Sequence, residues 1–314
     1  MISGVWIPLI TPFKGGTIDF ESYRRLIGHY VGHGVSGLFP LGTTGEAPTL
    51  DEAEVDAVIA ETVDAAAGRV PVFVGIGGNA THKVIRTIRR AERHGFDGIV
   101  SVCPYYNRPA QDGLREHFTA ISEATDRPIL IYNIPYRTSV NLGNETLLRL
   151  AELTNIVGVK DSAGSMVQSL ELLANKPRGF SVLTGEDHLF LPLLCSGADG
   201  GILASGHLAT ERFVEIAQRV AANDHRGGLA IWSPLQRMIA SLFEEPNPMP
   251  LKHCLWRQGL IALPECRLPL TAVTDRLRDE LDRWLTTPAM GLAESTATAW
   301  AGTSNLRGLE ATNG

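Results

Sequence analysis

One apolar run of this sequence ends in a lysine. Residues 156–159 are Ile-Val-Gly-Val, and Lys160 follows them directly. Lys160 is either a solvated strand end paired with Asp161 or an amine placed inside the fold. Adjacent strand residues point to opposite faces, so an inward Lys160 leaves Asp161 outward, where we expect it to cap the next helix. A buried amine loses hydration, which lowers its pKa and lets it attack a ketone to form a Schiff base.

A tyrosine lies near the end of the preceding apolar run, residues 128–133. By itself, Tyr132 is consistent with an interior aromatic residue whose hydroxyl has a partner. In a barrel of sequential parallel strands, Tyr132 would lie beside Lys160 at the same level. A phenol in that position can move protons while a carbinolamine forms and collapses. The two residues together therefore indicate ketone chemistry on an amine.

Other strand ends add groups that could hold anions. The string GTTGE at 42–46 is either an ordinary loop or a turn whose N–H groups bind an anion. A carboxylate fits better than a triphosphate, because the string lacks the lysine of a P-loop. Arg137 is either a surface-loop arginine or a planar fork for a second carboxylate. Tyr105 and Tyr106 could serve the site or a subunit interface, where tyrosines are enriched.

These residues can meet only if the fold brings strand ends to one mouth. Short apolar runs alternate with amphipathic stretches, giving about eight βα units, which predicts a (β/α)8 barrel. A doubly wound open sheet, the alternative, would want a phosphate-binding glycine loop after its first strand, and none is present. The strand-like runs are 4–10, 37–41, 70–75, 98–103, 128–133, 156–160, 181–185 and 200–204.

The strand-like runs stop before residue 225. Three helical stretches follow, with the proline-rich break EEPNPMP at 244–250 between two of them. From Met290 onward the sequence is small, polar and aperiodic. We therefore expect a barrel over 1–224, a C-terminal helical extension over 225–289 and a disordered tail over 290–314.

Composition limits the class of protein. The chain has 314 residues, 44% of them hydrophobic, and a net charge of −6, which gives no electrostatic case for nucleic acid or anionic lipid. No apolar run approaches the roughly 20 residues that span a bilayer. The N-terminus lacks the basic start of a signal peptide, so we expect a cytoplasmic protein. The four cysteines have no C-x-x-C spacing, which favours reduced thiols and argues against zinc.

Seven strings across residues 4–285, taken together, resemble the dihydrodipicolinate synthase / N-acetylneuraminate lyase family of Schiff-base (β/α)8 barrels. The combination is highly specific, although no single string is. In chain order the strings are TPF, GTTGE, PYYNRP, YNIPYRT, GVKDS, EPNPMPLK and RLPLT.

The resemblance implies a role for each matching residue. Lys160 would be the amine that condenses with pyruvate. Thr43, Tyr132 and Tyr106 would form a proton relay, with Tyr106 delivered across a dimer interface into the neighbouring site. The substrate-binding positions would be Thr44 for the pyruvate carboxylate, Arg137 for the carboxylate of aspartate semialdehyde, and Gly185 and Ile202 as walls beside the ketoacid.

Within the family, two features favour the synthases. GTTGE has two threonines where neuraminate lyases tend to have Ser-Thr, and Arg137 stands where sugar-acid lyases usually lack an arginine. The implied reaction condenses pyruvate with L-aspartate 4-semialdehyde to 4-hydroxy-tetrahydrodipicolinate in lysine and diaminopimelate biosynthesis. The resemblance implies no metal and no cofactor. It suggests a homo-oligomer, at least a dimer and in the family a dimer of dimers.

Two departures from the family pattern leave alternatives open. Leu203 and His207 replace a small polar residue and an asparagine, which could alter the second-substrate pocket. A related lyase, aldolase or dehydratase acting on a sugar-derived 2-oxo acid therefore stays open. A catalytically silent barrel that binds ketoacids as a sensor is a third hypothesis, and the intact set of Lys160, Tyr132, Thr43 and Tyr106 argues against it. Glu52 and Lys83 stand where lysine-inhibited members tend to have a histidine and an acidic residue. We expect weak or absent inhibition by lysine, because Lys83 would repel its ammonium group.

Overall fold

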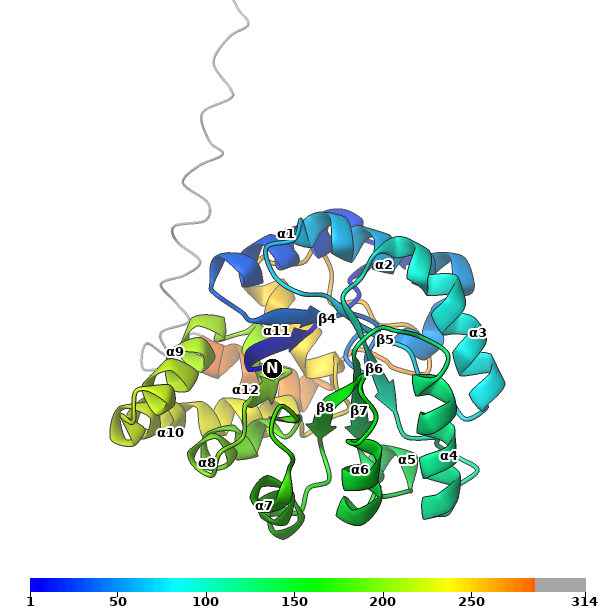
Figure 1. Cartoon of the computed structure of the whole chain (residues 1–314). Coiled ribbons are helices and arrows are strands. Elements are labelled where there is room, and N and C mark those ends of the chain that lie inside the picture. The colour runs from blue at the N-terminus through cyan, green and yellow to red at the C-terminus, as the bar shows by residue number, and fades with distance from the viewer. Residues whose placement is uncertain (286–314) are drawn as a thin grey trace, which may run out of the picture.

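The computed structural model describes residues 1–285 and contains a closed parallel barrel. Eight strands are hydrogen-bonded in the order β4-β1-β10-β9-β8-β7-β6-β5. A parallel bridge between Leu38 and Val72 joins the two ends of this order and closes the barrel. Helices surround the strands (Figure 1). The predicted (β/α)8 fold is confirmed, and each predicted strand-like run coincides with one strand, although β8 extends one residue beyond its run to Asp161.

The barrel strands are short and the helices between them are amphipathic. The strands are β1 Gly4–Pro8, β4 Gly37–Phe39, β5 Phe73–Gly75, β6 Gly98–Val102, β7 Ile129–Asn133, β8 Ile156–Asp161, β9 Ser181–Thr184 and β10 Gly200–Ile202. The helices around them are α1 Phe20–Gly32, α2 Glu52–Ala66, α3 Thr81–Ala91, α4 Gln111–Ser122, α6 Asn144–Leu150, α7 Met166–Asn175, α8 Phe190–Cys195 and α9 Thr210–Ala221. A short helix, α5 Pro135–Thr138, follows β7, and a small hairpin of β2 Phe13–Lys14 and β3 Thr17–Ile18 follows β1.

Large and small residues alternate in the barrel interior. Trp6 and Phe73 belong to the interior cluster and stack edge to face at 5.1 Å. A Cβ atom at Gly37 would lie 2.4 Å from the Trp6 ring, and one at Gly98 would lie 2.4 Å from the Phe73 ring. The two glycines therefore make room for the aromatic rings that fill the barrel. A larger cluster lies between the strands and the surrounding helices.

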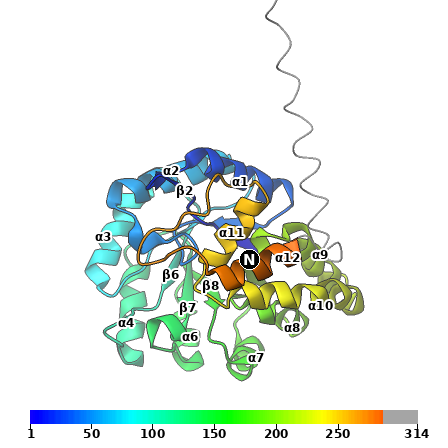
Figure 2. The same cartoon turned by 180° about the vertical axis from the view of Figure 1, so that it is seen from behind.

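Three helices follow the barrel: α10 His225–Leu242, α11 Met249–Arg257 and α12 Asp275–Leu285. Helix α10 packs against α9 and α8, while α11 packs against α12. Seen from behind, α11 and α12 lie in front of the strands (Figure 2). Lys252 of α11 contacts Glu46 of the GTTGE loop, so α11 lies at the end of the barrel where strand β4 ends. The expected tail at 290–314 lies outside the described residues.

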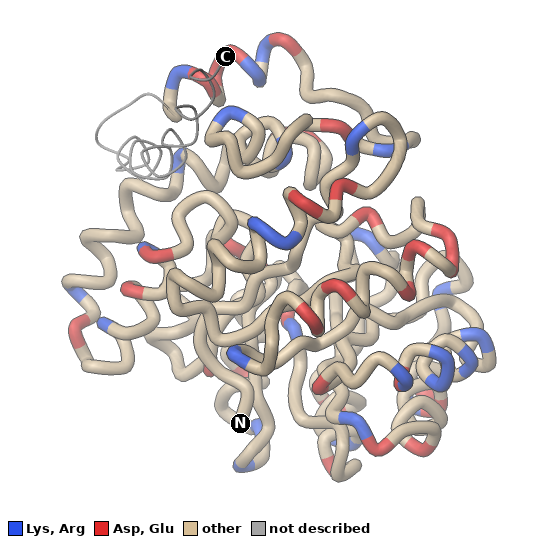
Figure 3. The backbone as a smooth tube through the Cα atoms, turned by 90° about the horizontal axis from the view of Figure 1, so that it is seen from above, with Lys and Arg blue, Asp and Glu red and all other residues tan. Residues whose placement is uncertain are grey.

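Charged residues of both signs are interspersed along the backbone, mostly on the outer helices and loops (Figure 3). Many of them form ion pairs between neighbouring helices, such as Arg24 of α1 with Glu61 of α2. This distribution agrees with the modest net charge of −6. In the described part of the chain, no helix is long and apolar enough to cross a membrane.

Candidate active site

Lys160 and Tyr132 lie side by side, as the sequence predicts. They are register partners on the parallel strands β8 and β7. In a parallel pair, register partners point to the same face, which here is the barrel interior. The Lys160 Nζ atom lies 4.2 Å from the centroid of the Tyr132 ring and 5.1 Å from that of Phe39. The amine is therefore enclosed by aromatic rings at the mouth of the barrel.

Burial changes the acid–base properties of this pair. Lys160 is 6% exposed, and the loss of hydration lowers the pKa of its amine to about 8. The Asp187 and Glu186 carboxylates act in the opposite direction, while Arg137 lowers this pKa further. Burial also raises the pKa of the Tyr132 phenol well above its usual value. The site thus holds an amine that loses its proton easily next to a phenol that keeps its own.

One pocket collects seven of the eight residues to which the resemblance assigns a catalytic or substrate-binding role. Lys160 lies in it with hydroxyl groups, an arginine and apolar walls, and Tyr106 is the assigned residue that does not line it. The lining residues are Pro8, Thr43, Thr44, Tyr132, Tyr136, Arg137, Lys160, Gly185, Asp187, Ile202, Ala204, Phe243 and Asn247. Among residues 1–285, no group of three or more His, Cys, Asp or Glu is arranged to hold a metal ion.

The GTTGE loop folds back on itself above strand β4. The Gly45 N–H donates to the Gly42 carbonyl, and the Glu46 N–H donates to the Thr43 carbonyl. Thr11 fixes the far side of the loop, because its hydroxyl donates to the Gly45 carbonyl at 2.7 Å. In the described part of the chain, the N–H groups of Thr43 and Thr44 have no acceptor. Free backbone N–H groups at a turn favour an anion, which agrees with the sequence-based expectation.

At Gly185 the backbone passes close to the Lys160 side chain, and any side chain at this position would require Lys160 or Ser162 to move. A Cβ atom at position 185 would lie 2.6 Å from Lys160 Cε and 2.2 Å from Ser162 Oγ. The Gly185 N–H donates to the Asp161 carbonyl at 2.7 Å, which anchors the chain after β9 against β8. The resemblance assigned Gly185 to a wall of the pocket, and in the structure the backbone of Gly185 forms that wall by passing close to the Lys160 side chain.

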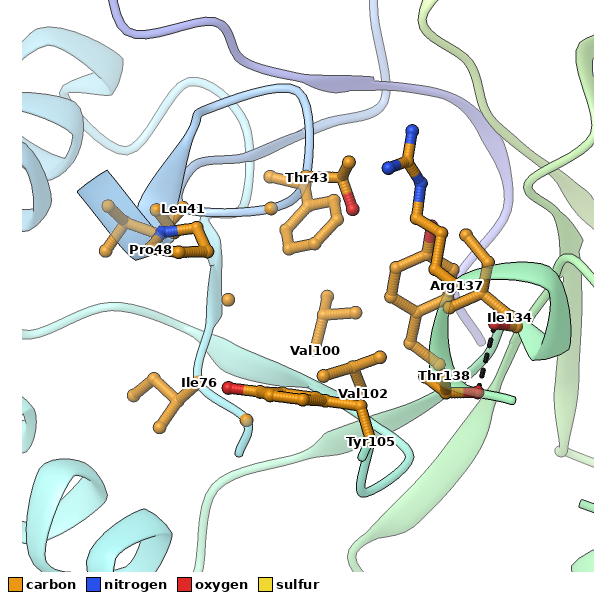
Figure 4. Close-up of a pocket in the computed structure, with 16 residues that line it drawn as sticks. Leu41, Thr43, Pro48, Ile76, Val100, Val102, Tyr105, Ile134, Arg137 and Thr138 are labelled. Carbon is orange, nitrogen blue, oxygen red and sulfur yellow. Dashed lines mark hydrogen bonds between the residues drawn. The ribbon is translucent and has the colours of Figure 1, made fainter. Parts of the chain in front are cut away.

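A larger cavity of about 300 Å³ lies on the other side of Thr43, Tyr132 and Arg137, which line both spaces. Figure 4 shows Arg137 reaching from α5 toward Thr43, while Tyr105 lies across the opposite side of the cavity. The guanidinium carbon also lies 5.5 Å from the Tyr136 ring centroid. Arg137 is exposed on α5 and lines both the cavity and the pocket of Lys160.

Tyr106 is not brought into the site by its own chain. Its side chain is 89% exposed and lines neither cavity. Its φ of 73° lies in the left-handed region, which is strained for a residue with a side chain. The loop around it is held in place, because Asn107 donates to the Asn79 carbonyl and Arg108 to the Ser139 carbonyl. The role of Tyr106 across a dimer interface stays a prediction.

Glu186, Asp187 and Asn247 are among the residues at the site that sequence reasoning missed. Glu186 and Asp187 follow β9, and their carboxylates act on Lys160. Burial raises the pKa of Glu186 to about 7 and also raises that of Asp187, whose carboxylate accepts from the Ser205 N–H at 2.6 Å. Asn247 comes from the proline-rich break and donates to Thr44 Oγ1. The string TGEDH at 184–188, at the end of β9, was a usable signal for the two carboxylates. Nothing in the sequence places Asn247 beside residue 44.

Leu203 and His207 do not line the pocket of Lys160. Leu203 belongs to the cluster between strands and helices. The His207 ring lies between the Tyr30 hydroxyl at 2.6 Å from Nδ1 and the Pro8 carbonyl at 2.9 Å from Nε2. Burial lowers the pKa of His207 to about 4, so the ring is neutral and accepts from Tyr30 while donating to Pro8. His207 thus holds Pro8, which lines the pocket of Lys160, from the side away from the pocket.

Asp161 points outward and is not the counter-ion of Lys160, as alternation predicts. The expectation that it caps the next helix is wrong in detail, because the residue before the first turn of α7 is Ser165. Asp161 instead accepts hydrogen bonds from the Ala163 N–H at 3.0 Å and from the Ser169 hydroxyl at 2.5 Å. These bonds hold the loop after β8 against α7 and leave the Lys160 amine to the pocket.

A family profile described as "Dihydrodipicolinate synthetase family" matches residues 1–287. The chain belongs to this family. It is 50% identical over 284 residues to the 4-hydroxy-tetrahydrodipicolinate synthase 2 of Clostridium acetobutylicum, covering 90% of this chain and 99% of the relative. The dihydrodipicolinate synthase structure from Aquifex aeolicus is 38% identical, with a TM-score of 0.89 over 92% of this chain and 98% of that one.

A second solved structure carries a ligand. The chloride-inhibited dihydrodipicolinate synthase from Acinetobacter baumannii, complexed with pyruvate, is 35% identical with a TM-score of 0.89. The match covers 93% of this chain and all of that one. Both the barrel and the appended helices of this chain therefore have counterparts in the dihydrodipicolinate synthases.

Proposed function

We propose that this family member condenses pyruvate with L-aspartate 4-semialdehyde to give 4-hydroxy-tetrahydrodipicolinate and water. The observation that carries the proposal is the buried Lys160 amine beside Tyr132, in a pocket that also holds Arg137. Relatives that share 50% and 40% of their residues with this chain over nine tenths of its length bear the name of this synthase. The reaction serves lysine and diaminopimelate biosynthesis.

Lys160 is the nucleophile. With a pKa of about 8, a substantial fraction of the amine is neutral near physiological pH. The neutral Nζ attacks the ketone carbon of pyruvate, and loss of water from the carbinolamine gives a protonated Schiff base. This cation withdraws electrons from the methyl carbon, which loses a proton to form an enamine. The enamine carbon then bonds to the aldehyde carbon of the second substrate.

Tyr132 and Thr43 move the protons of these steps. Both line the pocket of Lys160, and the raised pKa of Tyr132 keeps its hydroxyl protonated until a stronger base is formed beside it. After the carbon–carbon bond has formed, the amino group of the second substrate attacks the imine carbon. The ring closes, the bond to Lys160 Nζ breaks, and the free amine returns.

The two substrate carboxylates bind at different places. The pyruvate carboxylate lies at the Thr44 hydroxyl and the free N–H groups of the GTTGE loop, with Gly185 and Ile202 as walls. Arg137 receives the carboxylate of aspartate semialdehyde at the boundary with the larger cavity. This separation leaves the aldehyde carbon free to approach the enamine.

Trapping with borohydride tests the proposal. Pyruvate and borohydride together should add one reduced pyruvyl group to a peptide that contains Lys160, and Lys160→Met should abolish the labelling. A coupled assay with pyruvate and a panel of aldehydes should give the highest kcat/KM with aspartate semialdehyde. Folded protein that does not label would refute the Schiff base. If pyruvate labels Lys160 but aspartate semialdehyde is not converted, the result would favour a lyase or aldolase that acts on another 2-oxo acid.

The site also requires a second copy of the chain. Tyr106, which its own chain leaves exposed, completes the proton relay in the pocket of the neighbouring subunit. Mixing Lys160→Ala with Tyr106→Phe subunits tests this arrangement. In a mixed dimer one site has both mutated residues and the other has neither, so activity should return. If Tyr106 acted within its own chain, the mixture would stay as inactive as its components.

A further inference from the structure

The end of the segment between α10 and α11 and the first turn of α11 contact the GTTGE loop at two buried points. Asn247 Nδ2 donates to Thr44 Oγ1 at 2.9 Å, and the two residues are 8% and 4% exposed. One turn into α11, Lys252 Nζ lies 2.5 Å from Glu46 Oε1, with both side chains fully buried. Residues 203 positions apart in the sequence therefore meet at the loop that carries two of the predicted site residues.

The first of these contacts fixes the direction of a hydroxyl group. A threonine hydroxyl has one proton to donate and lone pairs with which to accept. Because the Asn247 amide nitrogen can only donate, Thr44 Oγ1 accepts this bond and keeps its own proton for another partner. In the described part of the chain, no residue accepts that proton. Thr44 lines the pocket of Lys160, so a ligand bound in that pocket can accept this proton.

We propose that Asn247 is a positioning residue that holds the Thr44 hydroxyl as a hydrogen-bond donor to the carboxylate of the bound 2-oxo acid. The proposal rests on the proposed function, because it takes that ligand to be pyruvate. Asn247 acts through Thr44. It therefore controls how much pyruvate is needed to fill the site and leaves the rate of reaction at the Lys160 amine almost unchanged.

The surrounding charges make the direction of this hydroxyl important. Glu186 and Asp187 place two carboxyl groups near Lys160, and their negative charge disfavours a further anion in the pocket. A threonine that donated its proton to another protein group would present only a lone pair to the pyruvate carboxylate and add to this repulsion. A threonine that donates offsets it with a hydrogen bond to a charged group, which is about twice as strong as a neutral one.

Borohydride trapping at varied pyruvate concentration tests the proposal without the second substrate. Asn247→Ala should raise the pyruvate concentration for half-maximal labelling about tenfold, and the maximal rate should change less than about twofold. Asn247→Asp keeps the shape of the side chain and turns the donor into an acceptor, so it should raise the half-saturating concentration further. Asn155→Ala is the matched control, because Asn155 donates to the Ser122 and Thr125 carbonyls before β8 begins. It should leave the pyruvate dependence unchanged.

A double-variant cycle separates positioning from a general structural effect. In a Thr44→Val background, Asn247→Ala should add less than about twofold to the half-saturating pyruvate concentration, since no hydroxyl remains to be positioned. An equal effect in both backgrounds, or a normal pyruvate dependence of Asn247→Asp, would overturn the proposal. Asn247→Asp keeps the test decisive if the alanine variant does not fold. If the unmodified chain is not labelled by pyruvate, the proposed function fails and this proposal fails with it.

Discussion

Lys160 and Tyr132 are register partners on neighbouring strands, and the amine nitrogen lies 4.2 Å from the centre of the phenol ring. Backbone hydrogen bonds of the barrel fix this relationship, so it does not depend on a mobile loop. The same strands send Asp161 to the opposite face, where Ser169 of α7 binds it. The barrel thus separates the lysine from the acid next to it in the sequence and keeps the amine available for a ketone.

Removing the Tyr132 hydroxyl should slow the reaction without loosening the barrel. Tyr132→Phe keeps the ring that packs against Lys160, and we expect kcat to fall about 100-fold or more, as is typical when a positioned proton donor is lost. The measurements are kcat, and the melting temperature to show that the variant is as stable as the unmodified chain. Tyr23→Phe is the control, because the Tyr23 hydroxyl bonds Thr62 between α1 and α2, far from the pocket. Equal kcat values for the two variants would contradict the proton relay.

Schiff-base formation should follow the titration of Lys160. Because burial lowers the pKa of this amine to about 8, the rate of pyruvate labelling should rise about tenfold per pH unit below pH 8 and level off above it. The labelling rate rises with pH because only the neutral form of the Lys160 amine attacks pyruvate.

Glu186→Gln provides an internal check on that profile. Glu186, with a pKa of about 7, is mostly ionised at pH 8, and its charge raises the pKa of Lys160. Removing the charge should move the midpoint of the labelling profile to lower pH. A midpoint that stays in place, or that moves upward, would contradict this electrostatic coupling.

Gly185 should not tolerate a methyl group. In Gly185→Ala the new Cβ would meet Lys160 Cε at 2.6 Å and Ser162 Oγ at 2.2 Å, so the amine has to move. We expect pyruvate labelling to fall at least about tenfold, because small displacements of reacting groups are costly. Gly28→Ala is the matched change, since a Cβ there meets nothing within 4 Å inside α1. That variant should label normally and be as stable or more stable.

The Lys252–Glu46 pair should matter for stability. Both side chains are fully buried, and the Lys252 amine also donates to the Glu265 carbonyl at 2.8 Å. Lys252→Met leaves the Glu46 carboxylate buried without its cation and should lower the free energy of unfolding by about 3–5 kcal/mol. Glu46→Gln combined with Lys252→Met should recover part of that loss in urea unfolding. A double variant that loses the sum of both single effects would show that the charges do not interact.

Lysine should inhibit weakly or not at all. Lys83 is exposed at the start of α3, and Glu52, which could offset its charge, is paired with Arg90 at 2.5 Å. The ammonium group of an incoming lysine therefore meets a cation and no free carboxylate at these two positions. The measurement is the lysine concentration for half inhibition, which we expect in the millimolar range or above. Inhibition at micromolar lysine would contradict the prediction, and Lys83→Glu should increase sensitivity.

The sequence by itself determined the barrel and most of the site. The alternation of apolar runs with helical stretches predicted the strands, since buried parallel strands and amphipathic helices have different periods. The two-residue period of a strand was enough to predict that Lys160 points into the barrel and Asp161 points outward. Because the carboxyl ends of barrel strands share one mouth, Thr43, Tyr132 and Arg137 could be grouped with Lys160 from their positions at strand ends alone.

Contacts between segments far apart in the chain were decided only by the tertiary structure. Nothing in the proline-rich string at 244–250 shows that Asn247 reaches Thr44, because that contact depends on how the appended helices pack across the barrel. The same holds for His207, which looked like a change in the pocket and proved to be a buried link between Tyr30 and Pro8. Periodicity reports which face a residue occupies, whereas the partner on that face depends on the packing of the whole chain.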